Sequence, residues 1–195
     1  MIEVIGIIPS RVKLLDFPEL RQTFMYDCGA LSLQSVLVYY GLDINESSVM
    51  QRLGTTEKSG TSIENMITGA KSYGIEVVHK VGMSIEDLKS SINCGYPTII
   101  SLQAWVSEER LRKEPNFSYK DVYDEGHYVV CIGYDDQDLK VYFEDPADPR
   151  RTWLSWDTLS ERWHDQDDNG KKYERWGMTC IASPVFRRNQ VVFMR

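Results

Sequence analysis

Hydrophobic residues in the first half of the chain recur at helical spacing. Between Cys28 and Tyr40 they are too dense for a single stripe, which predicts a largely buried helix that ends near Gly41. Three shorter amphipathic segments follow, each opening on a residue suited to cap a helix. They run from Asn45 or Glu46 to Leu53, from Thr61 or Ser62 to Gly74, and from Ser84 to Gly95. The N-terminal half is therefore expected to be mainly helical.

The pattern changes after Gly95, where β-branched and aromatic residues dominate. The expected strands are 97–105, 127–135, 140–146 and 178–186. The polar run DDQD at 135–138 reads as a turn, so the second and third of these strands should form an antiparallel hairpin. Helices first and antiparallel strands second is the pattern of an α+β fold.

Composition narrows the picture to one folded domain. The chain has 195 residues without an internal repeat or a low-complexity linker, so we expect a single domain over 1–195. It contains no run near the roughly 18 apolar residues that a membrane helix needs, so membrane insertion is not expected. A net charge of −7 makes nucleic acid an unsuitable partner. The N-terminus lacks the features of a secretory signal, which favours the cytoplasm but is compatible with export by a signal-independent route.

The four cysteines are spread singly along the chain, without the paired spacing of a zinc site or a disulfide framework. We expect free thiols and no metal or organic cofactor. Cys94, Cys131 and Cys180 are expected to pack as small hydrophobic residues. Cys28 differs because it stands at the first turn of the expected helix, where unpaired N–H groups and the helix dipole favour a thiolate.

A nucleophilic thiol needs a base and a group that orients the base. His79 alternates with apolar neighbours on an expected strand, and His164 lies in a polar stretch that reads as a solvated helix end or loop. His127 opens a strongly apolar strand, where it could face a cleft. Asp145 lies on the other arm of the expected hairpin and could pair with His127, although the stretch EDPADP at 144–149, taken by itself, is more simply a turn capped by aspartates.

The order of these residues resembles that of a known family. The residues that carry the resemblance are Gln22, the run Asp27-Cys28-Gly29, the stretch GHYVV at 126–130 and EDP at 144–146. They resemble the bacteriocin-processing cysteine peptidases and their stand-alone relatives, over about 21–163. The segment RRTWLSWDTLSERW at 150–163 also looks like the strand-then-helix ending of that family.

The resemblance implies a papain-like fold in which the helical N-terminal half packs on an antiparallel sheet. It also implies that Cys28 is the nucleophile, His127 the general base and Asp145 the orienting group. Gln22 would donate its amide to an oxyanion hole beside the backbone N–H of Cys28. Asp27 receives no chemical step, and either caps the helix or touches substrate.

Two departures limit what is carried over from the family. The family commonly forms part of a membrane exporter with an ATPase, but this chain has no P-loop motif, so cleavage after a double-glycine leader is not implied. A long polar connection at 104–126 is expected to rim the substrate cleft.

We therefore predict a cysteine peptidase or amide hydrolase that acts on a peptide or protein substrate. The alternatives are a catalytically silent peptide-binding module on the same fold and an acyl or amide transferase that uses the same residues.

Overall fold

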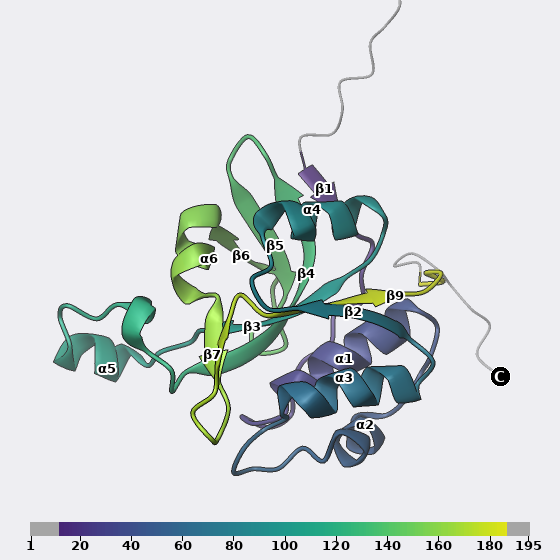
Figure 1. Cartoon of the computed structure of the whole chain (residues 1–195), viewed down its shortest axis with the longest axis horizontal. Helices are drawn as coiled ribbons and strands as arrows, with labels where there is room; N and C mark the ends of the chain where they lie inside the picture. The colour runs from purple at the N-terminus through teal and green to yellow at the C-terminus, as the bar shows by residue number, and fades with distance from the viewer. Residues whose placement is uncertain (1–11, 187–195) are drawn as a thin grey trace, which may run out of the picture.

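An antiparallel sheet forms the centre of the computed structural model, which describes residues 12–186 (Figure 1). Its strands follow the order β2-β9-β3-β4-β5-β6, and β1 pairs with β4 off this path. The bounds are β1 Val12–Leu14, β2 Glu76–Lys80, β3 Thr98–Gln103, β4 Gly126–Asp135, β5 Lys140–Glu144, β6 Thr152–Ser155 and β9 Gly177–Ile181. A separate two-stranded sheet joins β7 (His164–Gln166) to β8 (Lys172–Glu174).

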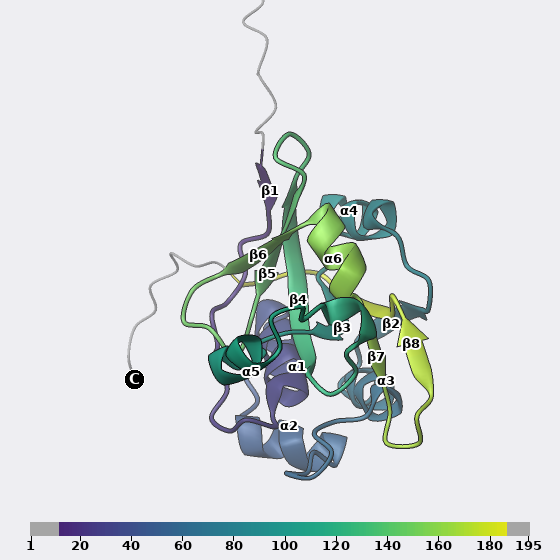
Figure 2. The ribbon, with the colours of Figure 1, turned by 90° about the vertical axis from the view of Figure 1, so that its left-hand side faces the viewer.

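Three of the four helices in the N-terminal half cover one side of this sheet. Helices α1, α2 and α3 lie together on that side, with α1 against β4, while α4 lies on the other side (Figures 1 and 2). The helices are α1 Cys28–Tyr39, α2 Glu46–Leu53, α3 Ile63–Ser72, α4 Ile85–Asn93, α5 Glu108–Lys113 and α6 Trp156–Arg162, with a 3₁₀ turn at Tyr119–Asp121. The arrangement is the predicted α+β fold, with a helical N-terminal half packed on an antiparallel sheet.

The local signals in the sequence correspond to the observed element ends. Asn45, Ser62 and Ser84 cap α2, α3 and α4 with their side chains. Helix α1 is buried over most of its length, because it lies between β4 on one side and helices α2 and α3 on the other. The hairpin of β4 and β5 is antiparallel as predicted, and Asp135 Oδ1 accepts the two backbone N–H groups of its turn. The expected strand-then-helix ending is present as β6 and α6.

Two expectations about individual residues are wrong. His164 is not solvated: it is 4% exposed, begins β7, and its Nε2 lies 2.8 Å from the carbonyl oxygen of Val122. The sequence around His164 is polar and does not indicate strands, but it forms a small hairpin, β7–β8, that packs over β3. Cys94 is exposed, because it lies at the C-cap of α4, past the buried positions Leu88 and Ile92 that face the core. Cys131 and Cys180 are buried as predicted.

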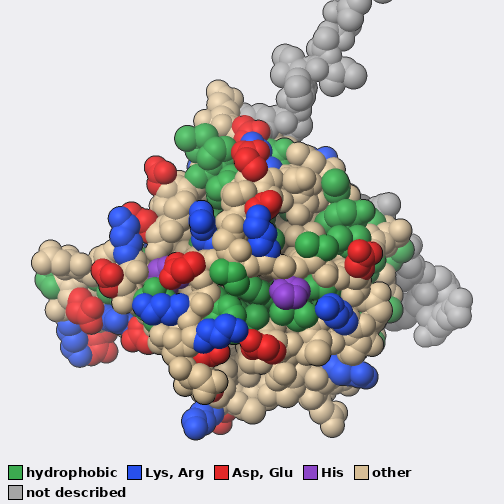
Figure 3. Space-filling model, in the orientation of Figure 1, with side chains coloured by type: hydrophobic (Ala, Val, Ile, Leu, Met, Phe, Trp, Pro, Cys, Tyr) green, Lys and Arg blue, Asp and Glu red, His purple; other side chains and the backbone are tan. Residues whose placement is uncertain are grey.

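The surface carries charges of both signs. On the face drawn in Figure 3, basic and acidic side chains alternate around small apolar areas. Within residues 12–186, no helix has both the length and the apolar character needed to cross a membrane.

Candidate active site

Helix α1 presents Cys28 at its first position, beside the sheet. The helix is held against β4 by Ser32, whose hydroxyl donates to the carbonyl oxygen of Tyr128 at 3.2 Å. Gly29 permits the close approach, because a Cβ there would lie 3.0 Å from Thr61 Cβ and 3.1 Å from Tyr128 Cδ2. The close packing of α1 against β4 therefore favours a glycine after the cysteine.

The β4–β5 hairpin brings His127 and Asp145 together. His127 is the second residue of β4, and Asp145 directly follows β5. The Nε2 atom of His127 lies 2.8 Å from Asp145 Oδ1, and both side chains are buried. The adjacent strand ends thus produce the pairing that the sequence alone left open.

Cys28 lies close enough to His127 to help raise the pKa of the imidazole. Since Nε2 faces Asp145, Nδ1 is the ring nitrogen left for the sulfur. Burial lowers the pKa of His127, but the hydrogen bond with Asp145 and the nearby Cys28 outweigh burial and raise the pKa to about 10. The site therefore favours the imidazolium form of His127.

Four donors converge on the carboxylate of Asp145. Oδ1 accepts from His127 and from the backbone N–H of Ala147 at 2.9 Å. Oδ2 accepts from the indole N–H of Trp105 at 3.1 Å and from the Thr152 hydroxyl at 3.4 Å. Trp105 belongs to the 104–126 connection, and its backbone is held in the left-handed region at φ 64°, from which its indole N–H donates to Asp145. No local pattern in the sequence marks Trp105 as a partner of Asp145. Its position follows from the pairing of Gln103 with Gly126, which places Trp105 near the start of β4.

Gln22 lies next to the turn that carries Asp145. Its backbone N–H donates to the carbonyl oxygen of Pro146 at 3.0 Å, and Arg21 forms an ion pair with the buried Glu144. The side-chain Nε2 of Gln22 donates to the carbonyl oxygen of Phe24 at 2.8 Å. An amide nitrogen has two hydrogens, so one N–H remains for another acceptor.

Asp27 does not cap α1, contrary to one of the two expectations for it. Instead, its Oδ2 accepts the backbone N–H groups of Thr23 at 3.1 Å and Phe24 at 3.0 Å. The side chain is fully buried. Burial and a contact with Glu46 raise the pKa of Asp27 to about 6. Asp27 therefore stabilises the turn that carries Gln22 instead of the helix that carries Cys28.

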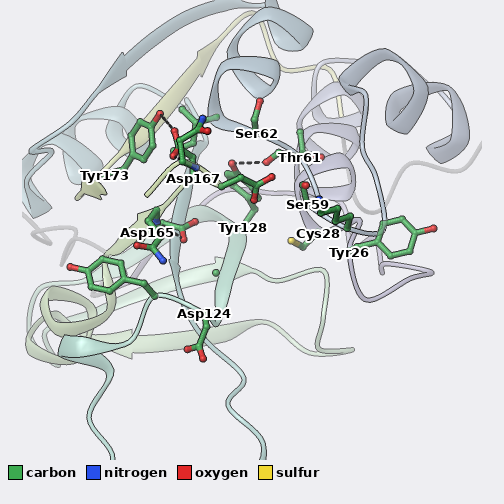
Figure 4. Close-up of a pocket in the computed structure, with 18 of the residues that line it drawn as sticks. Tyr26, Cys28, Ser59, Thr61, Ser62, Asp124, Tyr128, Asp165, Asp167 and Tyr173 are labelled. Atoms are coloured by element: carbon green, nitrogen blue, oxygen red, sulfur yellow. Dashed lines mark hydrogen bonds between the residues drawn. The ribbon is translucent and has the colours of Figure 1, made fainter. Parts of the chain in front are cut away.

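A cavity of about 610 Å³ opens beside Cys28 (Figure 4). Cys28 lies near one side of it, and Asp167 and Tyr173 lie on the far side. Gly126 contributes to the wall, where a Cβ would come within 2.7 Å of Asp165 Oδ1. Part of the 104–126 connection, at Tyr123 and Asp124, lines the cavity, as expected for a segment that rims a cleft.

Residues 12–186 contain no cluster of three or more His, Cys, Asp or Glu side chains placed to hold a metal ion. The groups described above form their contacts with one another and with the backbone. The chemistry available to them is nucleophilic attack by sulfur, proton transfer by an imidazole, and hydrogen bonding to a developing anion.

Comparison with known proteins points to one group. The model of the Peptidase_C39 like family matches residues 14–171. An uncharacterized protein of Methanothermobacter marburgensis is 27% identical over 127 residues, which span 65% of this chain and 70% of that protein.

Solved structures of similar fold belong to the same group. The double glycine motif protease from an AMS/PCAT transporter, solved with its leader peptide, is 20% identical with a TM-score of 0.57, over 88% of this chain and 94% of that one. A C39-like protein from Bacillus anthracis is 17% identical with a TM-score of 0.63, over 89% and 99%. The peptidase domain of Streptococcus ComA is 18% identical with a TM-score of 0.57, over 84% and 97%.

Proposed function

Because this chain belongs to the Peptidase_C39 like family, we propose that it is a cysteine peptidase or a closely related amide hydrolase, built as one domain. The observation that carries this proposal is the buried pair of His127 and Asp145, 2.8 Å apart, with Cys28 near enough to the imidazole to raise its pKa. Nucleophile, base and orienting group are the three roles that acyl transfer requires.

The first chemical step forms an acyl-enzyme. The proton of the Cys28–His127 pair lies on the imidazole, and the Cys28 sulfur attacks the carbonyl carbon of the scissile amide. The negative charge that develops on the carbonyl oxygen needs donors already in place. The backbone N–H of Cys28 is suited to this role because the first N–H groups of a helix have no partner within it. The remaining N–H of the Gln22 amide is the second donor.

The same imidazole completes the reaction. His127 gives its proton to the departing amine as the C–N bond breaks, which leaves a thioester on Cys28. A water molecule then loses a proton to His127 and attacks the thioester carbon. The C–S bond breaks, the carboxylic acid product leaves, and the proton returns to the pair of Cys28 and His127. Asp145 keeps Nδ1 directed at the sulfur throughout, since it holds Nε2.

A peptide or protein is the proposed substrate. The cavity is polar on several sides and has room for several residues of an extended chain beside Cys28. The double glycine motif protease with a similar fold was solved in complex with a leader peptide, which supports a peptide ligand for this fold.

The test compares wild type, Cys28→Ala and Cys94→Ala on a diverse peptide library, with products read by mass spectrometry. Cys94 is the matched control because it is the other thiol with solvent access among the described cysteines. Wild type and Cys94→Ala should give the same products, and Cys28→Ala none. Identical products from all three proteins reject Cys28 as the nucleophile. Ligated instead of hydrolysed products would assign acyl transfer to the same residues.

A further inference from the structure

A pair of acidic side chains lies directly beside the start of α1. Asp27 precedes Cys28 and is 0% exposed, and Glu46 is the first residue of α2. Both side chains bond to the same turn, and each shifts the pKa of the other. Asp27 Oδ1 and Glu46 Oε1 are buried and have no partner among the described residues. Ionised carboxylates only accept hydrogen bonds, so these two unpaired oxygens can satisfy each other only by sharing a proton.

The other carboxylate oxygens of Asp27 and Glu46 both accept hydrogen bonds from a single turn, residues 22–27. Asp27 Oδ2 accepts from the backbone N–H groups of Thr23 and Phe24. Glu46 Oε2 accepts from the hydroxyl of Thr23 at 2.7 Å. The same turn carries Gln22, whose amide is tied to the carbonyl oxygen of Phe24. The direction of the Gln22 amide therefore depends on how firmly the pair holds the turn.

The shared proton belongs to Asp27. Burial raises the pKa of Asp27, and the contact with Glu46 raises it further, to about 6. Burial also raises the pKa of Glu46, but hydrogen bonds from Asp27 and Thr23 outweigh it and lower that pKa. The N-terminus of α2 also favours the negative charge on Glu46. Glu46 is the charged group that faces Asp27 from α2, and Tyr26 and Cys28 are the titratable neighbours along its own segment.

We propose that Glu46 is a positioning residue of the active site, which holds the 22–27 turn through one proton shared with Asp27 so that the Gln22 amide faces the developing oxyanion. This inference rests on the peptidase function proposed above. When the pair loses its proton, two carboxylates repel at close range and the turn loosens. The donor is then lost from the transition state, while contacts to substrate in the cavity remain. The signature is a fall in kcat as pH rises through the titration of the pair, with KM little changed.

The experiment measures kcat and KM from about pH 5 to about pH 8.5 for wild type and three variants, a span that brackets the midpoint expected for the pair. Glu46→Gln provides a permanent N–H donor to Asp27, so its kcat should match wild type at the acid end and exceed it at the alkaline end. Glu46→Ala removes both contacts, and its kcat should fall about tenfold, less than the loss of the oxyanion donor itself. The control is Glu108→Gln, because Glu108 also begins a helix but its side chain is 90% exposed. Its profile should follow wild type.

A second measurement does not depend on turnover. The side-chain ¹³C signal of Asp27, followed by NMR, should titrate near pH 6 in wild type. In Glu46→Gln the midpoint should move towards the ordinary value of about 4, because the amide N–H stabilises the charged carboxylate. An unchanged midpoint overturns the shared proton. Wild-type kcat in Glu46→Ala, or a constant ratio of Glu46→Gln to wild type at every pH, overturns the positioning role alone. If wild type cleaves no peptide, the peptidase proposal itself fails, and the role of Glu46 in catalysis fails with it.

Discussion

Replacing Asp145 by asparagine tests the proposed site most directly. All four partners of this side chain are donors: His127, Ala147, Trp105 and Thr152. Both carboxylate oxygens must therefore accept, and an asparagine would turn an NH₂ group towards one pair of donors in either orientation. The substitution is nearly isosteric, yet it is not conservative here.

The magnitude follows from the contact with His127. A hydrogen bond to a charged group contributes about 1.5–3 kcal/mol, which corresponds to about one to two pKa units. The pKa of His127, raised to about 10 in part by Asp145, should fall by that amount in Asp145→Asn. We expect kcat/KM to drop roughly tenfold to 150-fold, and the alkaline limit of activity to move down by about one to two pH units, since the leaving amine needs a protonated imidazole.

The assay is kcat/KM against pH for wild type, Asp145→Asn and Asp148→Asn, on a peptide found in the library screen. Asp148 lies in the same turn, but its carboxylate pairs with Arg150 at the surface, so it controls for changes to the turn itself. Circular dichroism and thermal unfolding check that each variant folds. If Asp145→Asn and Asp148→Asn have the same activity and the same alkaline limit, the assignment of Asp145 is refuted.

Three further outcomes are expected. Trp105→Phe removes one hydrogen-bond donor to the carboxylate of Asp145, which costs about 1 kcal/mol, so kcat should fall about fivefold. The control is Trp153→Phe, because Trp105 and Trp153 are equally exposed, at 52%; this substitution should leave kcat unchanged. Gly29→Ala should destabilise the protein by about 1–3 kcal/mol in urea unfolding, because the new methyl group meets atoms at 3.0–3.1 Å; unchanged stability would contradict the close packing. Iodoacetamide should leave Cys131 and Cys180 unmodified in the folded protein by mass spectrometry, because burial raises the pKa of each to about 12; their labelling before unfolding would argue against that burial.

Several features were predictable because they depend on neighbours in the sequence. The caps at Asn45, Ser62 and Ser84 bond to backbone groups within the next turn. Helical and strand periodicities gave the order of elements, and hence the α+β class. The order of the motif residues gave the family. The roles assigned to Cys28 and His127 stay predictions, although the fold brings the two side chains into contact.

Errors arose where one segment covers another. His164 was expected in solvent because its neighbours in sequence are polar, but β7 and β8 fold over β3 and bury it. Asp27 was expected either to cap the helix or to touch substrate; its side chain does not cap the helix, and it bonds instead to the turn before it. Cys94 was expected to be buried, but it lies at the end of α4, beyond the side chains that reach the core.

The sequence by itself determined where the main helices and the central strands form and which residue types are available for chemistry, because those signals come from spacing and from groups a few residues apart. The tertiary structure decided which of these residues meet. The register of β4 against β5 sets the distance from His127 to Asp145. The close approach of α1 to β4 at Gly29 brings Cys28 beside the sheet. The chain beyond the end of β3 places Trp105 within hydrogen-bonding distance of the Asp145 carboxylate. Such contacts join segments far apart along the chain, so they depend on sheet register and core packing, which act only once the whole domain has folded.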